Sequence, residues 1–273
     1  MTTVAADGYF SERSMLRRVH HEHVVSLAGP RALLMQAAHP VAFAGFFAST
    51  GALDDPYPRL QRTAAALNAV IFGPREVADR VSARIRRVHS RYRGRLPEAV
   101  GPFPAGTPWA ADDPDLLLWI IATLVDSSLL VYERYVRRLR PAERQAYWED
   151  YRTVGTLFGL PSSASPESLA ELEGYIGDML AGEQLFVSPQ ARALGVEIVL
   201  HPPVPLAGRP LLELANFITV GLLPRRLRAA YGLRWDPLRT LVHRSGAEYA
   251  RRLLVPILPG RVRYNRAPLL APR

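Results

Sequence analysis

The stretch from Arg59 to Gly94 reads RLQRTAAALNAVIFGPREVADRVSARIRRVHSRYRG. This pattern predicts two helices joined at Gly73-Pro74, because glycine commonly ends a helix and proline is tolerated in the first turn of the next one. Gly94 is predicted to stop the second helix. That helix carries many arginines and a single histidine, His89.

The predicted second helix, residues 74–93, has an apolar face and a basic face. His89 lies four residues after Ile85 and three before Tyr92, so it is expected on or beside the buried face. Two interpretations follow. His89 is either a core histidine bonded to a backbone carbonyl, or a metal ligand directed into a protected cavity, since neutral imidazole is a common ligand of iron and zinc. The apolar face consists of Val77, Val81, Ile85, Val88 and Tyr92.

A cationic turn opens the first helix. Arg59 and Thr63 are four residues apart and share a face that Leu67 and Val70 continue, while Arg62 is one step round. The pattern predicts a cavity with an apolar wall and a cationic mouth, which suits a flat apolar ring that carries carboxylates. The alternative is a surface salt bridge and a threonine bonded to its own helix.

The rest of the chain also predicts helices. The run VEIVLHPPVP has strand character, but its prolines disfavour a central strand. Residues 95–111 are predicted as a loop, and the segment after residue 258 as an irregular tail. One all-α domain of about ten helices, spanning residues 1–273, is therefore expected. The other helices are expected near 30–38, 115–139, 141–158, 167 onward, 189–200, 210–222, 225–231 and 236–254.

The run from Asp115 to Leu139 is apolar nearly all round, which predicts a central buried helix. Asp126 lies inside it and needs a partner, an arginine or a histidine N–H, because an unpaired buried carboxylate is costly. His39 ends an earlier apolar run; it either faces the same cavity or interacts with its helix C-terminus. His20 and His23 share one helical side and are weaker metal candidates.

Composition excludes several classes of site. All 34 basic residues are arginine and the formal charge is +9, yet the arginines are spread over many helices, which disfavours a nucleic-acid-binding arm. The absence of cysteine excludes disulfides, thiolate metal sites and thiolate nucleophiles. The N-terminal residues lack the apolar core of a signal peptide, and the run Leu116–Val131 is shorter than the roughly 20 residues of a membrane span. We expect a cytoplasmic protein, with peripheral membrane contact left open.

Four blocks in order and spacing resemble the MpaB-type oxygenase family, which shares its catalytic domain with the latex clearing proteins, the rubber oxygenases. The resemblance covers about residues 10–200, and its specific part is 29–155. The blocks are GPRALLMQAAHPVAFAGF, DPYPRLQRT, VIFGPREVADRVSARIRRVHSRYRG and DPDLLLWIIATLVDSSLLVYERYVRRLRPAERQAYWEDYRTVG.

The resemblance implies an all-α, globin-like core that binds b-type haem. His89 matches the proximal iron ligand, and RLQRT supplies Arg59, Arg62 and Thr63 where the rubber oxygenases have Arg-x-x-Lys-Thr over the haem. Arginine at 62 stays protonated and cannot be a distal ligand, as lysine can. Ile121 stands where many relatives have a histidine. His39 and Asp126 are further expected cofactor contacts, Asp126 by orienting a histidine.

The implied function is oxidation or cleavage of a C=C bond by O2 on haem, in a hydrophobic isoprenoid- or polyketide-like molecule. Arg59, Arg62 and Thr63 would polarise bound oxygen or fix the haem and substrate. Two alternatives stay open because fold does not determine reaction. One is a haem enzyme with another oxidative reaction; the other is a haem-free helical protein that binds a lipid or a partner.

Overall fold

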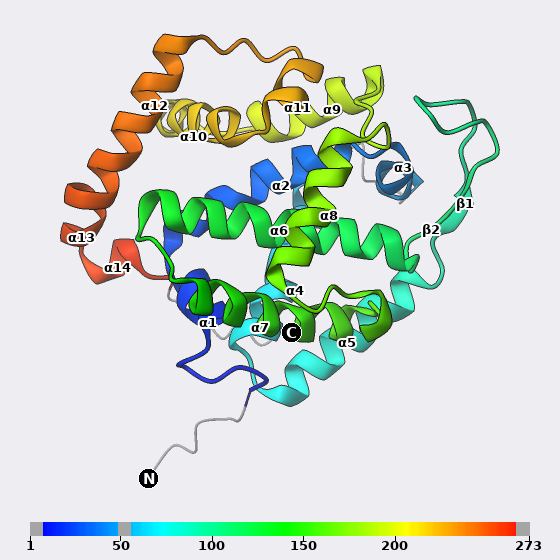
Figure 1. Cartoon of the computed structure of the whole chain (residues 1–273), viewed down its shortest axis with the longest axis horizontal. Coiled ribbons are helices and arrows are strands. Elements are labelled where there is room, and N and C mark those ends of the chain that lie inside the picture. The colour runs from blue at the N-terminus through cyan, green and yellow to red at the C-terminus, as the bar shows by residue number, and fades with distance from the viewer. Residues whose placement is uncertain (1–7, 49–55, 266–273) are drawn as a thin grey trace.

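The computed structural model describes residues 8–48 and 56–265, and there the chain is almost entirely helical (Figure 1). The all-α prediction is confirmed, with 71% of the described residues in helices. The one sheet in the described ranges is an antiparallel hairpin of β1 (Arg93–Arg95) and β2 (Pro108–Ala110). Residues 1–7 and the end of the predicted tail, residues 266–273, lie outside the described part of the chain.

The central helix is α6 (Pro114–Tyr135). Asp113 caps it, because its carboxylate accepts from the backbone N–H of Asp115 at 2.9 Å and Pro114 fits the first turn. With 22 residues, α6 is long and apolar enough to cross a membrane by length and composition, and 67% of its most apolar window is buried inside the fold. It is therefore the core helix that was predicted, although it ends at Tyr135 rather than Leu139.

Helices cover α6 on several sides (Figure 1). It packs against α2 (Ala28–Ala37) on one side and α7 (Pro141–Phe158) on another, and α8 (Leu169–Ala181) crosses it. The short α1 (Met15–His21) packs on α7 and continues into a 3-10 turn, His23–Leu27. Apolar side chains between these helices form the main core, which includes the fully buried Trp148.

The C-terminal helices form a further layer along α2 and α6 (Figure 1). The tail predicted as irregular contains a short helix whose Arg263 donates to both carboxylate oxygens of Glu22, at 2.8–3.1 Å, and so ties the tail to the N-terminal region. The elements are α9 (Pro189–Leu200), α10 (Arg209–Leu222), α11 (Arg225–Ala230), α12 (Pro237–Tyr249) with a π-helical continuation (Ala250–Leu254), α13 (Val255–Ile257) and α14 (Gly260–Arg263).

The predicted helix pair is present as α4 (Tyr57–Phe72) and α5 (Arg75–His89), joined at Gly73-Pro74. A side chain at Gly73 would lie 2.4 Å from the Ala69 carbonyl oxygen, so only glycine fits this close turn. The predicted end of the second helix is wrong. The helix stops at His89, because residues 93–95 pair with residues 108–110 of the segment predicted as a loop.

Candidate functional site

Five elements meet at the region where the predicted site residues gather. They are the end of α5, the start of α4, α3 (Pro40–Ala48), the β1–β2 hairpin and the start of α6. Trp109 of β2 forms a small core there with Val41 and Leu96. Half-buried apolar side chains surround this core, so the region has an apolar wall: Ala44, Tyr92, Phe103 and Leu116.

His89 is the last residue of α5 and is half-buried. Its Nδ1 atom is buried and has no hydrogen-bond partner among the described residues, so the structure does not support a ring bonded through Nδ1 to a backbone carbonyl. Burial lowers the pKa of His89, the positive charge of Arg59 lowers it further, and Asp112 opposes them. At pH 7 the ring is therefore a neutral imidazole, the form that binds metals.

Arg59 lies half-buried in the first turn of α4, and burial lowers the pKa of its guanidinium. Its positive charge also lowers the pKa of His89. Arg62 and Thr63 are exposed, and the Thr63 hydroxyl donates to the Arg59 carbonyl at 3.1 Å. The threonine thus follows the alternative prediction of a bond within its own helix. Arg59 is the residue of this turn whose positive charge acts on the pKa of His89.

His39 is buried between α2 and α3, with 6% of its surface exposed. Its Nδ1 accepts from the backbone N–H of Ala42 at 3.3 Å, so it caps the start of α3. Its ring lies tilted against Phe103, with centroids 5.4 Å apart. Burial lowers the pKa of His39 to about 4, and Asp113 partly opposes this shift. The His39 ring is therefore neutral at pH 7, so it does not stabilise the C-terminus of α2 as a positive charge would.

Asp126 takes the arginine partner that was one of the two predicted possibilities. The Arg31 guanidinium contacts its carboxylate at 2.7 Å, and also donates to the Ser127 hydroxyl at 2.6 Å and to the Leu222 carbonyl at 2.9 Å. The pair therefore fastens α6 to α2 and α10. The predicted role of Asp126 in orienting a histidine stays a prediction, and the ion pair with Arg31 gives its carboxylate a structural partner.

Two features of the site could not be foreseen from the sequence pattern. One is Trp109, which packs against Gly94 so closely that a methyl group there would lie 2.8 Å from its ring. The other is the proximity of segment 185–187, whose Phe186 N–H donates to the Ala38 carbonyl at 2.8 Å beside His39. The first depends on the pairing of β1 with β2, and the second on packing between segments far apart in the chain.

A hollow of about 620 Å³ lies beside this segment, with mostly apolar walls and two arginines. Arg226 is held there by the Leu180 and Gly182 carbonyls, and Arg192 by the Ala230 carbonyl. His89 does not line this hollow. The lining residues are Leu185, Phe186, Val187, Pro189, Arg192, Ala193, Arg226 and Ala230.

The weaker metal candidates find other partners. His20 Nε2 lies 3.1 Å from the Tyr147 hydroxyl, and His23 Nδ1 lies 2.9 Å from the Val262 carbonyl. Within residues 8–48 and 56–265, no group of three or more His, Cys, Asp or Glu side chains could hold a metal ion.

Comparison with known proteins gives one family and two relatives. The catalytic-domain family of the ER-bound oxygenases mpaB and B' and the rubber oxygenases matches residues 17–252. Two uncharacterized mycobacterial proteins, from Mycobacterium bovis and Mycobacterium tuberculosis, are each 25% identical over 182 residues. The alignments cover 66% of this chain and 68% of each relative. No solved structure matches the chain.

Proposed function

The chain belongs to the family of MpaB-type and rubber oxygenase catalytic domains, and on that premise we propose that it is a haem-dependent oxygenase acting on a hydrophobic molecule with a C=C bond. The family is one of oxygenases. The haem, the substrate class and the roles of individual residues are the proposed part. The single observation that carries them is the buried Nδ1 atom of His89, which has no hydrogen-bond partner among the described residues.

The proximal ligand of a haem in this protein would be His89. Its imidazole is kept neutral by burial and by Arg59, and its Nδ1 is buried with no partner among the described side chains and backbone groups. Haem brings four ring nitrogens of its own, so one histidine suffices as a protein ligand.

The surroundings of His89 fit the cofactor in polarity. The apolar face of α5 remains half-buried at Val77, Val81 and Ile85, so it retains surface for a flat apolar group. The half-buried Arg59 carries a guanidinium whose charge acts on His89, and a guanidinium is suited to hold a carboxylate. Arg62, exposed one step round the helix, supplies a second positive charge.

Haem, when bound, supplies the iron chemistry that binds and activates O2. The chain's own residues would set the conditions. Arg59 provides N–H donors toward oxygen or a carboxylate, and the apolar wall around Trp109 excludes water. Because arginine at position 62 stays protonated, it would not serve as a ligand to the haem iron as a lysine could.

A hydrophobic alkene is the substrate class that we propose. The apolar hollow beside Phe186 lies next to the α2–α3 junction and offers a way for such a molecule to approach. Cleavage of one C=C bond with both atoms of one O2 gives two carbonyl groups, so the overall reaction balances without a separate reductant. Oxygen uptake with alkenes, without added peroxide, separates this reaction from a peroxidase-like one.

The test is the absorption spectrum of the purified protein, oxidised and reduced, beside those of His89→Ala and His39→Ala. We expect a haem band in the wild type and in His39→Ala, and its loss or shift in His89→Ala. A band sensitive to His39 and indifferent to His89 would move the ligand to the α2–α3 junction. A protein that takes up no haem, even after reconstitution, would overturn the proposal.

A further inference from the structure

The positive charge of the chain is concentrated at its C-terminal end. Residues 201–273 contain 13 arginines and 3 acidic residues, a formal charge of +10, whereas residues 1–200 contain 21 arginines and 22 acidic residues, a formal charge of −1. The arginines are spread along the chain, as predicted. The excess of arginines over acidic residues, however, lies entirely within residues 201–273. Within the described part, residues 201–265 contain 11 arginines and 3 acidic residues, a formal charge of +8, so the C-terminal layer of helices is strongly basic.

Exposed apolar side chains gather in the same layer. Among the described residues, 13 large hydrophobic side chains are exposed, and 11 of them lie between positions 206 and 262. Single exposed hydrophobics are ordinary, but a concentration of them marks an interaction surface. They are Leu206, Leu211, Leu214, Leu238, Leu241, Val242, Tyr249, Leu253, Leu254, Ile257 and Val262.

Helix α12 carries apolar side chains on its solvent-exposed side as well as on its buried side. His243 and Ala247, four residues apart, face the core. At about 100° per residue, a second apolar stripe falls on the side opposite these two residues, where a surface helix normally carries polar groups. That stripe consists of Leu238, Leu241, Val242, Tyr249 and, one turn further, Leu253, with exposed fractions from 53% to 68%.

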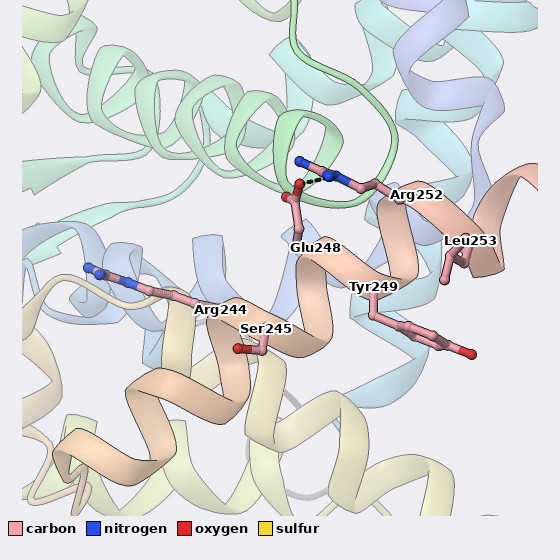
Figure 2. Close-up of a pocket in the computed structure, with 6 residues that line it drawn as sticks. All are labelled: Arg244, Ser245, Glu248, Tyr249, Arg252 and Leu253. Atoms are coloured by element: carbon pink, nitrogen blue, oxygen red, sulfur yellow. Dashed lines mark ion pairs between the residues drawn. The ribbon is translucent and has the colours of Figure 1, made fainter.

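Arginines flank this stripe, and the acidic residue among them is already neutralised. The Glu248 carboxylate pairs with Arg251 at 2.6 Å and also with Arg252. Figure 2 shows Glu248 and Arg252 on one side of the helix and Tyr249 on the other, with Arg244 free of this pair. These residues border a shallow hollow of about 490 Å³ between the charged and apolar sides of the helix.

We propose that the C-terminal layer, led by the outward stripe of α12, docks on the surface of an anionic phospholipid bilayer. Apolar side chains on one helix face with arginines beside them are the arrangement of helices that lie in the membrane interface. The leucines and Tyr249 would enter the boundary between headgroups and acyl chains. The arginines would contact lipid phosphates, which bind the guanidinium well.

Charge decides between this partner and two others. A second copy of the chain, meeting this face symmetrically, would bring two strongly positive surfaces together, which is unfavourable. Nucleic acid would satisfy the arginines, but its phosphate backbone gives the exposed leucines no apolar partner. An anionic bilayer satisfies both features, and this inference depends neither on haem nor on the proposed reaction.

The test is flotation of the purified full-length protein with vesicles of phosphatidylcholine alone, or mixed with phosphatidylglycerol. We expect binding to the anionic vesicles and weak binding to the neutral ones. Raising the salt from 0.1 M to 1 M shortens the screening length from about 10 Å to about 3 Å, so it should weaken binding. The triple variant Leu241→Ser, Tyr249→Ser and Leu253→Ser should bind at least about tenfold more weakly, since it removes the inserting side chains.

A charge-matched pair of variants supplies the control. Arg244→Gln with Arg252→Gln should weaken vesicle binding, whereas Arg80→Gln with Arg84→Gln, which removes the same charge from exposed positions of α5, should not. Circular dichroism should show every variant folded. The proposal is overturned if anionic vesicles are not bound, or if both charge variants lose binding equally. A dimer that the triple variant breaks, or DNA binding that it leaves intact, without vesicle binding, would assign the surface to those partners instead.

Discussion

The Arg31 guanidinium meets the Asp126 carboxylate at 2.7 Å within the contact between α2 and α6. The arginine side chain is 4% exposed and the aspartate side chain 32%, so the positive charge is the deeper of the two. The Ser127 hydroxyl and the Leu222 carbonyl accept further N–H groups of the same guanidinium. The N–H groups of Arg31 thus find acceptors on both α6 and α10, and the ion pair holds the central helix α6 against α2 and α10.

Replacing Asp126 with asparagine should destabilise the protein by about 2–3 kcal/mol, because it leaves the buried charge of Arg31 without its counter-ion. Urea unfolding of the haem-free protein measures this loss. Asp178→Asn, at an exposed position of α8, is the control and should change stability by less than about 0.5 kcal/mol. If Asp126→Asn instead leaves stability intact and shifts the haem band, the carboxylate acts on the histidine and not on the fold.

The helix pair of residues 59–94 could be predicted because its signals are local. Gly73-Pro74 and the spacing of the apolar side chains fix the two helices without any distant contact. The end of α5 could not be predicted, since it depends on strand pairing with residues 108–110. Gly94 has the appearance of a helix stop, but in the structure it is the place where the Trp109 ring packs on the backbone.

The candidate site shows the same division. The sequence indicates that Asp126 requires a partner, yet the choice of Arg31 follows from the α2–α6 contact. It likewise places Arg59 and Thr63 on one face, but the Thr63 hydroxyl is satisfied within its own helix, as an exposed threonine can be. The relation of His89 to Arg59 joins two helices and becomes visible only when they pack.

Arg59→Gln should raise the pKa of His89, because it removes a positive charge that disfavours the imidazolium. Histidine NMR signals of the haem-free protein, followed through a pH titration, measure the change. Arg62→Gln removes an equal charge one step round the helix at an exposed position, and should change the pKa of His89 much less. Equal shifts in both variants would mean that Arg59 has no special place beside His89.

The same substitution has a consequence for the loaded protein. A protonated imidazole cannot bind iron, so a raised pKa should make haem leave at a higher pH in Arg59→Gln than in the wild type. Absorption spectra recorded during acidification compare the two midpoints. An unchanged midpoint would show that acid release does not depend on protonation of His89.

His243 should make the fold acid-sensitive. Burial, with Arg134 and Arg228 as lesser causes, lowers the pKa of His243 to about 4, whereas an unfolded histidine titrates near 6.5. Between pH 4 and pH 6.5 the unfolded chain binds more protons at His243 than the folded chain does. The stability that depends on a neutral His243 is therefore complete above about pH 6.5 and is lost as the pH falls toward 4. This one residue should account for about 2 kcal/mol of lost stability between pH 7 and pH 5.

Urea unfolding at pH 7 and pH 5 tests this, with His243→Gln beside the wild type. The glutamine can still reach the Tyr135 hydroxyl, which lies 3.3 Å from His243 Nε2, and it does not titrate. The variant should lose less stability on acidification than the wild type does. His201→Gln, at a side chain 62% exposed, should retain the wild-type pH dependence. The same pH dependence in His243→Gln and the wild type would contradict the assignment.

Gly94→Ala and Gly246→Ala should change stability in opposite directions. A Cβ at position 94 would lie 2.8 Å from Trp109 Cζ2 and 3.0 Å from its Cε2, and this ring is packed against Val41 and Leu96, so it must shift at a cost of about 1–3 kcal/mol. Gly246 lies inside α12 with no heavy atom within 4 Å of the added methyl group, so alanine should stabilise the helix by up to about 1 kcal/mol.

Because the hairpin begins four residues after His89, Gly94→Ala should also shift the haem band of the loaded protein, and Gly246→Ala should not. Urea unfolding and absorption spectra of the two variants decide the matter. A Gly94→Ala protein as stable as the wild type, with an unshifted band, would show that Trp109 can move freely and forms no fixed wall of the site.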